Sequence, residues 1–217
     1  MKPTDEINSQ PRWNRRPEAR RDEILAAAAE IFGEMGFVRA SLCDVARHAG
    51  VSAGTVSHYF GSKETLFEEL VRRKMEVFDG IEALIVEHRG SHGQVLRAVL
   101  EHIARVTGDR RAACLGSVVR AEAASLPGPA RIMMEQFGGR LSLLLGCLID
   151  AGVKAGEFRP VDAEAVSRII VPSLMGVIQD HHTLGAVLKR PSVPLERQVA
   201  AWFDLIFEGL LAPSRTS

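Results

Sequence analysis

The sequence predicts an all-α protein of about nine helices, and three observations support this. Apolar residues recur at helical spacing through most of the chain, strand-like alternation does not stand out, and Gly, Pro and Ser interrupt the pattern where helices are expected to end. The chain has 217 residues, of which 46% are hydrophobic and 25% are charged, so it can bury an ample core.

Residues 1–17 are polar, contain three prolines and show no apolar period, so we expect a flexible arm. The arm and the residues just after it are rich in arginine, although Trp13 is unusual for a disordered tail. The whole chain has a formal net charge of +0, so its total charge indicates no nucleic-acid partner. A solvated tail and a basic arm both fit the pattern.

Residues 18–35 are predicted to form the first helix, because Ile24, Ala28 and Phe32 fall on one face. A second helix follows Ser41, an N-cap residue with Asp44 as its capping-box partner, and ends at Gly50. A third helix starts after a second N-cap.

The third helix is expected over residues 52–59, with Ser52 as its N-cap and with Val56 and Phe60 directed inward. Thr55, Ser57 and His58 would then face solvent or a partner. Two short helices joined by a tight turn that contains Gly form the helix-turn-helix pattern.

This region resembles the N-terminal domain of the TetR/AcrR family of bacterial transcriptional repressors, over about residues 20–70. The resemblance is carried by Gly36-Phe37, Ser41, Asp44-Val45-Ala46, Ala49-Gly50-Val51-Ser52, Gly54, Tyr59-Phe60, Ser62-Lys63-Glu64 and Leu66. It implies an all-α homodimer with an operator-binding head and a ligand-binding body. We therefore expect a DNA-binding domain at residues 18–64 and a ligand-binding and dimerisation domain at residues 65–212.

The resemblance also implies which residues contact double-stranded operator DNA, because a polar helix face fits the major groove. The expected contacts are Arg39, Ser41, Ser52, Thr55, Ser57, His58, Tyr59 and Lys63. Tyr59 and Lys63 would contact backbone phosphates, and Thr55 and His58 would read bases.

Six further helices are predicted after the head. They cover residues 63–87 (one long rod), 94–106, 111–125, 131–153, 163–188 (kinked at Pro172) and 195–211. The body more loosely resembles AcrR-like members of the same family, at Arg120-Ala121-Glu122-Ala123 and at residues 155–159.

Apolar residues with scattered polar groups make the body a candidate for a small-molecule effector site. The candidate ligand contacts, chosen from helix faces, are His102, Val106, Val118, Glu122, Met134, Phe137, Leu141, Leu174 and Ile178. The last two helices are the candidate dimer interface, through Val177, Leu184, Trp202, Phe203, Ile206 and Leu210. Gly176 and Gly209 would permit close helix approach, and an intrachain core is the alternative.

Other functions are less consistent with the same sequence. A metal-dependent enzyme is disfavoured, because the adjacent His181 and His182 point about 100° apart on a helix and no metal-ligand spacing occurs. A redox-responsive repressor could signal through Cys114 or Cys147, which we expect to be inert in apolar helices. An activator or a nucleoid binder would keep the same head.

The three cysteines are far apart in sequence, which suits a reducing cytosol, and we see no signal peptide and no membrane span. We therefore expect a cytoplasmic protein with no cofactor and no metal.

Overall fold

The computed structural model describes residues 17–78, 80–87, 89–188 and 193–211, and over these residues the chain folds into helices joined by turns. The predicted all-α class is confirmed. The elements are α1 (Pro17–Arg39), α2 (Leu42–Ala49), α3 (Ala53–Phe60), α4 (Lys63–Met75), η1 (Glu76–Phe78), α5 (Gly80–Glu87), α6 (His92–Thr107), α7 (Arg110–Ala121), α8 (Pro127–Ile132), η2 (Met133–Gly139), α9 (Arg140–Lys154), α10 (Ala163–Leu188) and α11 (Leu195–Leu210). The expected arm lies outside the described residues, apart from Pro17.

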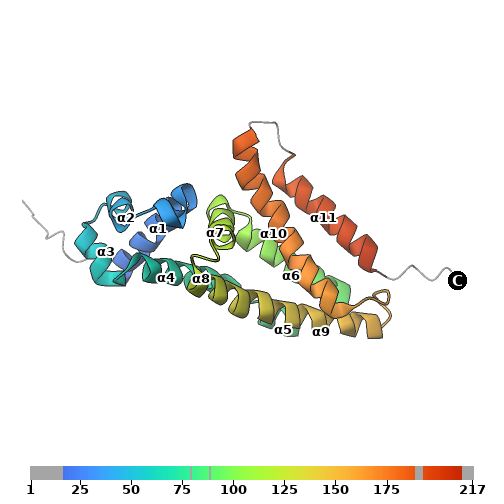
Figure 1. Ribbon diagram of the computed structural model, residues 1–217. Helices are drawn as coiled ribbons and strands as arrows, with labels where there is room; N and C mark the ends of the chain where they lie inside the picture. Colours follow the sequence, from blue (N-terminus) through green and yellow to red (C-terminus); the bar gives the residue numbers. More distant parts are fainter. Residues whose placement is uncertain (1–16, 79, 88, 189–192, 212–217) are drawn as a thin grey trace, which may run out of the picture.

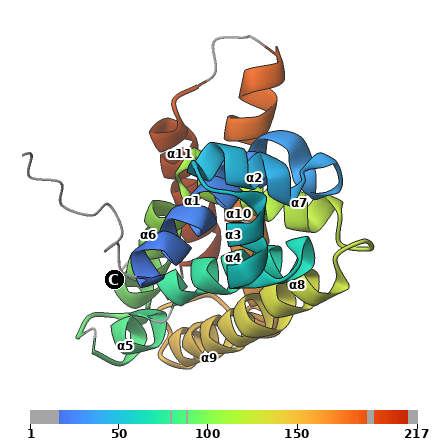
Figure 2. The ribbon, with the colours of Figure 1, turned by 90° about the vertical axis from the view of Figure 1, so that its left-hand side faces the viewer.

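The helices form a small head at one end of an elongated molecule and a larger body at the other (Figure 1). The head consists of α1, α2 and α3, and α4 leads from it toward the body. Seen from the head end, α2 and α3 lie at the front of the molecule (Figure 2).

The helix ends of the head are set by local hydrogen bonds. The side chains of Ser41, Ser52 and Ser62 each accept the backbone N–H three residues ahead, at the starts of α2, α3 and α4. Gly50 ends α2 in the left-handed conformation, with φ 65° and ψ 34°, which costs glycine little. These predicted caps are confirmed.

The head core is built on three phenylalanines. The rings of Phe32 and Phe67 meet edge to face with centroids 4.9 Å apart, and Phe37 lies 5.1 Å from Phe67. The same buried cluster extends along α4 to Val71 and includes side chains of α7 and α8, such as Leu115. The head is therefore packed directly onto the body, and its apolar core continues past residue 64.

A second buried cluster fills the body and joins α6, α9, α10 and α11. Trp202 of α11 lies inside it, and its Nε1 donates to the Ser173 hydroxyl of α10 at 3.0 Å. The indole is therefore satisfied within one chain.

The predicted single rod over residues 63–87 is wrong. The α4 helix ends at Met75, a short 3-10 turn follows, and α5 begins at Gly80. The apolar period continues across the break because Leu66–Val71 and Ile81 are both buried, but in the head and body clusters respectively. Gly80 is a weak helix former, so the chain can turn there.

The helix predicted at residues 131–153 starts earlier, at Pro127, because proline is favoured at the first helical position. It continues through the π-helical segment η2 into α9. By length and composition alone, Pro127–Lys154 is one helix in the described chain that could cross a membrane, which the sequence pattern had not indicated. A core helix passes the same test, and this one packs against α10 and α6.

Candidate functional sites

The third helix presents a polar face at the tip of the head. Val56 and Phe60 are buried and hold α3 against the head core. Ser57 and His58 lie on the other side and are exposed, as expected. Because α3 lies at the end of the molecule, this face is open to a partner (Figure 2).

The remaining expected contacts of α3 surround that face. Ser52 is exposed, and its Oγ lies 2.8 Å from the Thr55 Oγ1. Thr55 and Tyr59 are half-buried, and the Tyr59 ring lies edge to face with His58 at 5.7 Å. The structure therefore brings the predicted α3 residues together along one short helix.

The start of α2 is held by a capping box. The Ser41 hydroxyl donates to Asp44 Oδ2 at 2.5 Å, the Ser41 N–H donates to the same oxygen at 3.1 Å, and the Asp44 N–H donates to Ser41 Oγ at 3.2 Å. These bonds stabilise the ionised carboxylate, so the pKa of Asp44 lies below its ordinary value of 3.8. Arg39 is exposed nearby in sequence.

A pH dependence of head stability follows from the Asp44 cap. Because folding lowers the pKa of Asp44, its stabilisation is fully present above pH 3.8, the ordinary value, and is lost as the pH falls through the folded value. We expect Asp44→Asn to lower the melting temperature at neutral pH and to converge with the parent chain in acid. Melting curves recorded at a series of pH values would check this. A difference in melting temperature between the two proteins that stays constant in acid would contradict it.

Lys63 was expected to contact a DNA phosphate, but its ammonium is bound to the end of α1. Its Nζ donates to the carbonyls of Phe37 and Ala40, both at 3.0 Å, and lies 4.3 Å from the centre of the Phe37 ring. It thus caps the carbonyl end of α1 with a positive charge, where the helix dipole favours one. Sequence spacing alone gave no sign of this partner.

Glu122, expected to contact a ligand, binds the head instead. Its two carboxylate oxygens accept the N–H groups of Phe37 and Val38 at 3.2 and 3.1 Å. These amides are free because α1 is interrupted at Gly36, which has φ 74° and ψ 166°. A Cβ on Gly36 would lie 2.9 Å from the same carboxylate, so glycine suits both the backbone and the contact.

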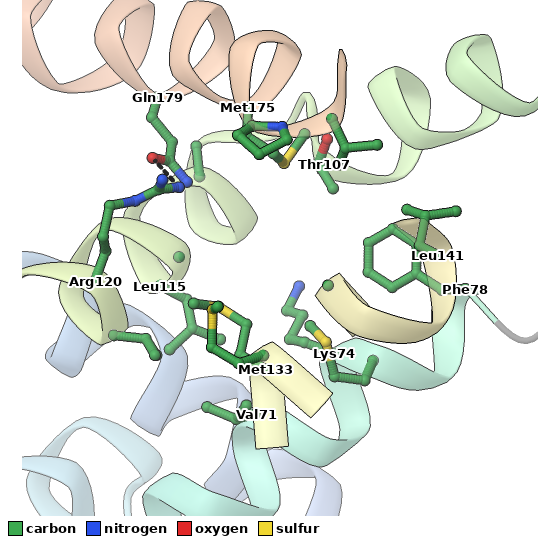
Figure 3. Close-up of a pocket in the computed structure, with 18 of the residues that line it drawn as sticks. Val71, Lys74, Phe78, Thr107, Leu115, Arg120, Met133, Leu141, Met175 and Gln179 are labelled. Carbon is green, nitrogen blue, oxygen red and sulfur yellow. Dashed lines mark hydrogen bonds between the residues drawn. The ribbon is translucent and has the colours of Figure 1, made fainter. Parts of the chain in front are cut away.

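The body contains a cavity of about 210 Å³ between α4, α6, α7, η2 and α10 (Figure 3). Its lining is mostly apolar. The lining residues are Val71, Lys74, Met75, Phe78, Val106, Thr107, Ala113, Leu115, Gly116, Val119, Arg120, Met133, Met134, Gly138, Leu141, Ser142, Val171, Pro172, Met175, Ile178 and Gln179. An apolar cavity with a few polar groups is typical of a small-molecule site.

Four of the expected ligand contacts line this cavity. These are Val106, Met134, Leu141 and Ile178. Three others are placed elsewhere: His102 Nδ1 accepts from Arg105 Nη2 at 2.8 Å, Val118 packs on the head core, and Leu174 is fully buried in the body core. The side chain of Phe137 lies outside the described residues.

The sequence reasoning missed the polar residues of the cavity wall. Lys74 extends into the cavity from α4, and Arg120 donates to the Gln179 Oε1 at 2.9 Å on another side (Figure 3). Arg120 belongs to a segment that carried the family resemblance, but its orientation could not be foreseen. Lys74 gives no signal of its own in the sequence, because a lysine between apolar helix positions looks like a solvated residue.

Three expected dimer contacts are corrected by the fold. Trp202, Phe203 and Leu210 are buried within the chain, because they form the face of α11 that packs on the body. Val177 and Ile206 are half-buried, and the side chain of Leu184 lies outside the described residues. Other residues therefore form the exposed surface of α10 and α11, including Leu205, which is 73% exposed.

The structure also bears on the other functions considered. Among the described residues, no group of three or more His, Cys, Asp or Glu side chains is placed to hold a metal ion. His181 lies 3.2 Å from Gln198 Nε2, and His182 lies 2.7 Å from the Gly108 carbonyl oxygen, so each ring has a partner on a different segment. Cys147, which was expected to be inert in an apolar helix, is exposed on α9.

Similarity to known proteins agrees with this architecture. Residues 24–70 match the family described as "Bacterial regulatory proteins, tetR family". The HTH-type transcriptional repressor KstR2 of Rhodococcus jostii (strain RHA1) is 26% identical over 198 residues, which are 89% of this chain and 92% of that protein.

Two further similarities span most of the chain. The fatty acid metabolism regulator protein of Bacillus subtilis (strain 168) is 28% identical over 138 residues, 63% of this chain and 70% of that protein. The solved structure of the ketosteroid transcriptional regulator KstR2 of Mycobacterium tuberculosis superposes with a TM-score of 0.69 at 22% identity, covering 91% of this chain and 98% of that chain. The structural similarity supports the fold.

Proposed function

Because the chain belongs to the tetR family of bacterial regulatory proteins, we propose that it is a ligand-responsive transcriptional repressor. In this proposal it binds a near-palindromic operator as a homodimer, and a small, largely apolar molecule releases it. The observation that carries the proposal is the open polar face of α3. The helix is held on the head, and serine N-caps fix the starts of α2 and α3.

An α-helix with short polar side chains fits the major groove of DNA. On α3, Ser57 and His58 are exposed, and Thr55 lies at the helix start. We assign base contacts to Thr55 and His58, and backbone contacts to Tyr59 and the N-terminus of α2. Arg39, Ser41 and Ser52 would flank the groove.

A direct test is selection of duplexes from random DNA by the purified full chain. The proposal expects a near-palindromic sequence whose half-sites are separated by about one helical turn, ~34 Å. Recovery of no sequence preference, or of single half-sites only, would argue against a dimeric repressor.

His58→Ala tests base readout by α3. A good side-chain pair to a base edge discriminates by about 1–3 kcal/mol, so we expect a roughly fivefold to hundredfold loss of preference at one operator position. Anisotropy titrations against operators that differ at single positions would measure it. An equal loss on every operator would instead indicate a backbone contact.

One head buries about 600–1,000 Å² on DNA, which favours a dimer for specific binding. We propose that a second copy covers the outer face of α10 and α11. Leu205 is 73% exposed there, and a Cβ on Gly176 or Gly209 would meet nothing within 4 Å in the single chain. Two glycines on an open face permit close approach of partner helices.

Leu205→Asp is expected to weaken the homodimer by about tenfold to a hundredfold, because burying a leucine side chain contributes about 1.5–3 kcal/mol. Sedimentation at several concentrations would measure the dissociation constant. Val86→Asp is the matched control, since Val86 is 77% exposed on α5, away from this face. Equal dimer strength for both variants would exclude Leu205 from the interface.

We assign effector binding to the cavity of Figure 3, because it is apolar and is lined by α4, the helix that follows the recognition helix. Similar proteins are named for fatty acid metabolism and as a ketosteroid regulator, which also favours an apolar effector. A ligand shifts DNA affinity only through its different affinity for the two states.

The proposed location is the cytoplasm, where the operator lies, and we propose no catalytic activity, since the similar proteins are regulators. A redox signal is a weaker candidate. Cys147 is exposed on α9, but Cys114 is half-buried with its Cβ 3.3 Å from a Cβ placed on Gly33.

A further inference from the structure

The cavity assigned to the effector has an uneven balance of charge. Its described lining includes two cationic side chains, Lys74 and Arg120, and no Asp or Glu. The other polar side chains of the wall are neutral, namely Thr107, Ser142 and Gln179. Any charged ligand in this cavity therefore meets a positive environment.

Lys74 differs from its two basic neighbours on α4. Arg72 is exposed, and Arg73 forms an ion pair with Asp22 at 3.1 Å. Lys74 is half-buried and makes no ion pair or hydrogen bond with the described part of the chain, and its ammonium extends into the cavity (Figure 3). An ammonium group against apolar walls costs free energy unless an anion is near, so a bound anion would be favoured there.

Arg120 is positioned by a neighbour. Its Nη2 donates to the Gln179 Oε1 at 2.9 Å, which joins α7 to α10 beside the cavity. The Gln179 amide nitrogen lies on the cavity side of that pair, 2.9 Å from a Cβ placed on Gly116. One side of the cavity thus presents the Lys74 ammonium, and another presents the hydrogen-bonded pair of Arg120 and Gln179.

We propose that the effector is an amphipathic carboxylate, an apolar molecule with one anionic end, and that Lys74 is its counterion. This inference rests on the proposed function of the cavity. The Arg120–Gln179 pair lies on another side of the cavity and leaves the apolar body of the ligand in contact with the remaining walls.

The walls suit apolar bodies of varied shape. Four of the chain's six methionines line the cavity, namely Met75, Met133, Met134 and Met175. Methionine is flexible and polarisable, and η2 is π-helical where it forms one wall. At about 210 Å³ the cavity is smaller than the ~300–1,000 Å³ typical of ligand sites, so an adaptable wall matters. Recognition then depends more on the anionic end than on the body.

The position of Lys74 also connects the ligand to the head. The α4 helix of 13 residues starts directly after the recognition helix, and Lys74 lies in its last turn. At ~1.5 Å per residue this helix spans about 20 Å. A carboxylate that forms an ion pair with Lys74 therefore contacts α4, the helix that directly follows α3.

Calorimetric titration of the full chain with decanoate, decanol and decylamine, without DNA, tests the charge preference. We expect decanoate to bind at least about tenfold more tightly than decanol, as for a charge-assisted hydrogen bond, and decylamine to bind most weakly. Lys74→Met should abolish the difference between decanoate and decanol, and Lys74→Arg should retain it. Arg72→Met, which removes the same charge from an exposed position, should also retain it.

Equal affinity for decanoate and decanol, a preference that survives Lys74→Met, or no binding of decanoate would each overturn the inference. A separate operator titration keeps the two proposals apart. Failure to bind any operator would refute the repressor, whereas release by decanol as readily as by decanoate would refute only the carboxylate.

Discussion

Lys63→Met is expected to lower the free energy of unfolding by about 3 kcal/mol. The variant removes charged hydrogen bonds to the Phe37 and Ala40 carbonyls and leaves both oxygens without this donor. It also removes the cation–π contact with the Phe37 ring, worth about 0.5–2 kcal/mol. Chemical denaturation of the purified protein would measure the loss.

The same variant distinguishes a structural from a phosphate-binding role. A lysine that neutralises one phosphate contributes about 0.9 to the slope of log affinity against log salt. If Lys63 remains on the end of α1, the slope for operator binding should stay near that of the parent chain. Arg72→Met is the control for charge on α4, and a reduced slope with unchanged stability would assign Lys63 to phosphate instead.

The local structure of the head could be predicted because its causes lie within a few residues. Ser41, Ser52 and Ser62 each cap a helix through the amide three positions ahead, and Gly50 supplies the left-handed residue that ends α2. Such contacts need no knowledge of the fold. The polar face of α3 followed from the same spacing, since two buried residues orient the helix.

The long-range contacts could not be predicted in this way. Glu122 is 84 residues from Val38 in sequence, and its position on a helix face suited a ligand as well as it suited the head. Trp202 fitted a dimer surface equally well, because periodicity identifies an apolar face but not what covers it. Only the packing of α11 on α10 places its indole beside Ser173.

The cavity shows the same limit. The apolar period predicts that Val106 and Ile178 face inward, but Lys74 and Arg120 look like solvated surface residues in sequence. The π-helical turn has no sequence signature, and it places Met133 and Met134 in the cavity wall. The chemistry of the site is therefore visible only in the folded chain.

Glu122→Ala is expected to reduce operator affinity by about tenfold and stability by about 2 kcal/mol. The carboxylate accepts two backbone amides at the break in α1, and hydrogen bonds to a charged group contribute about 1.5–3 kcal/mol. Glu122 directly follows α7, the helix that carries Val119 and Arg120 of the cavity wall. Without Glu122, the head loses a polar link to the wall that the ligand contacts, so its orientation in the dimer is less fixed.

Hydrogen exchange separates this role from the ligand contact that the sequence suggested. The amides of Phe37 and Val38 should exchange faster in Glu122→Ala, and Glu122→Gln should be intermediate because it keeps one acceptor oxygen. Glu34→Ala removes an exposed carboxylate from the same stretch of α1 and should change neither exchange nor operator affinity. Unchanged exchange at both amides, together with weaker binding of decanoate, would indicate that Glu122 contacts the ligand. The head would then be held on the body by apolar packing alone.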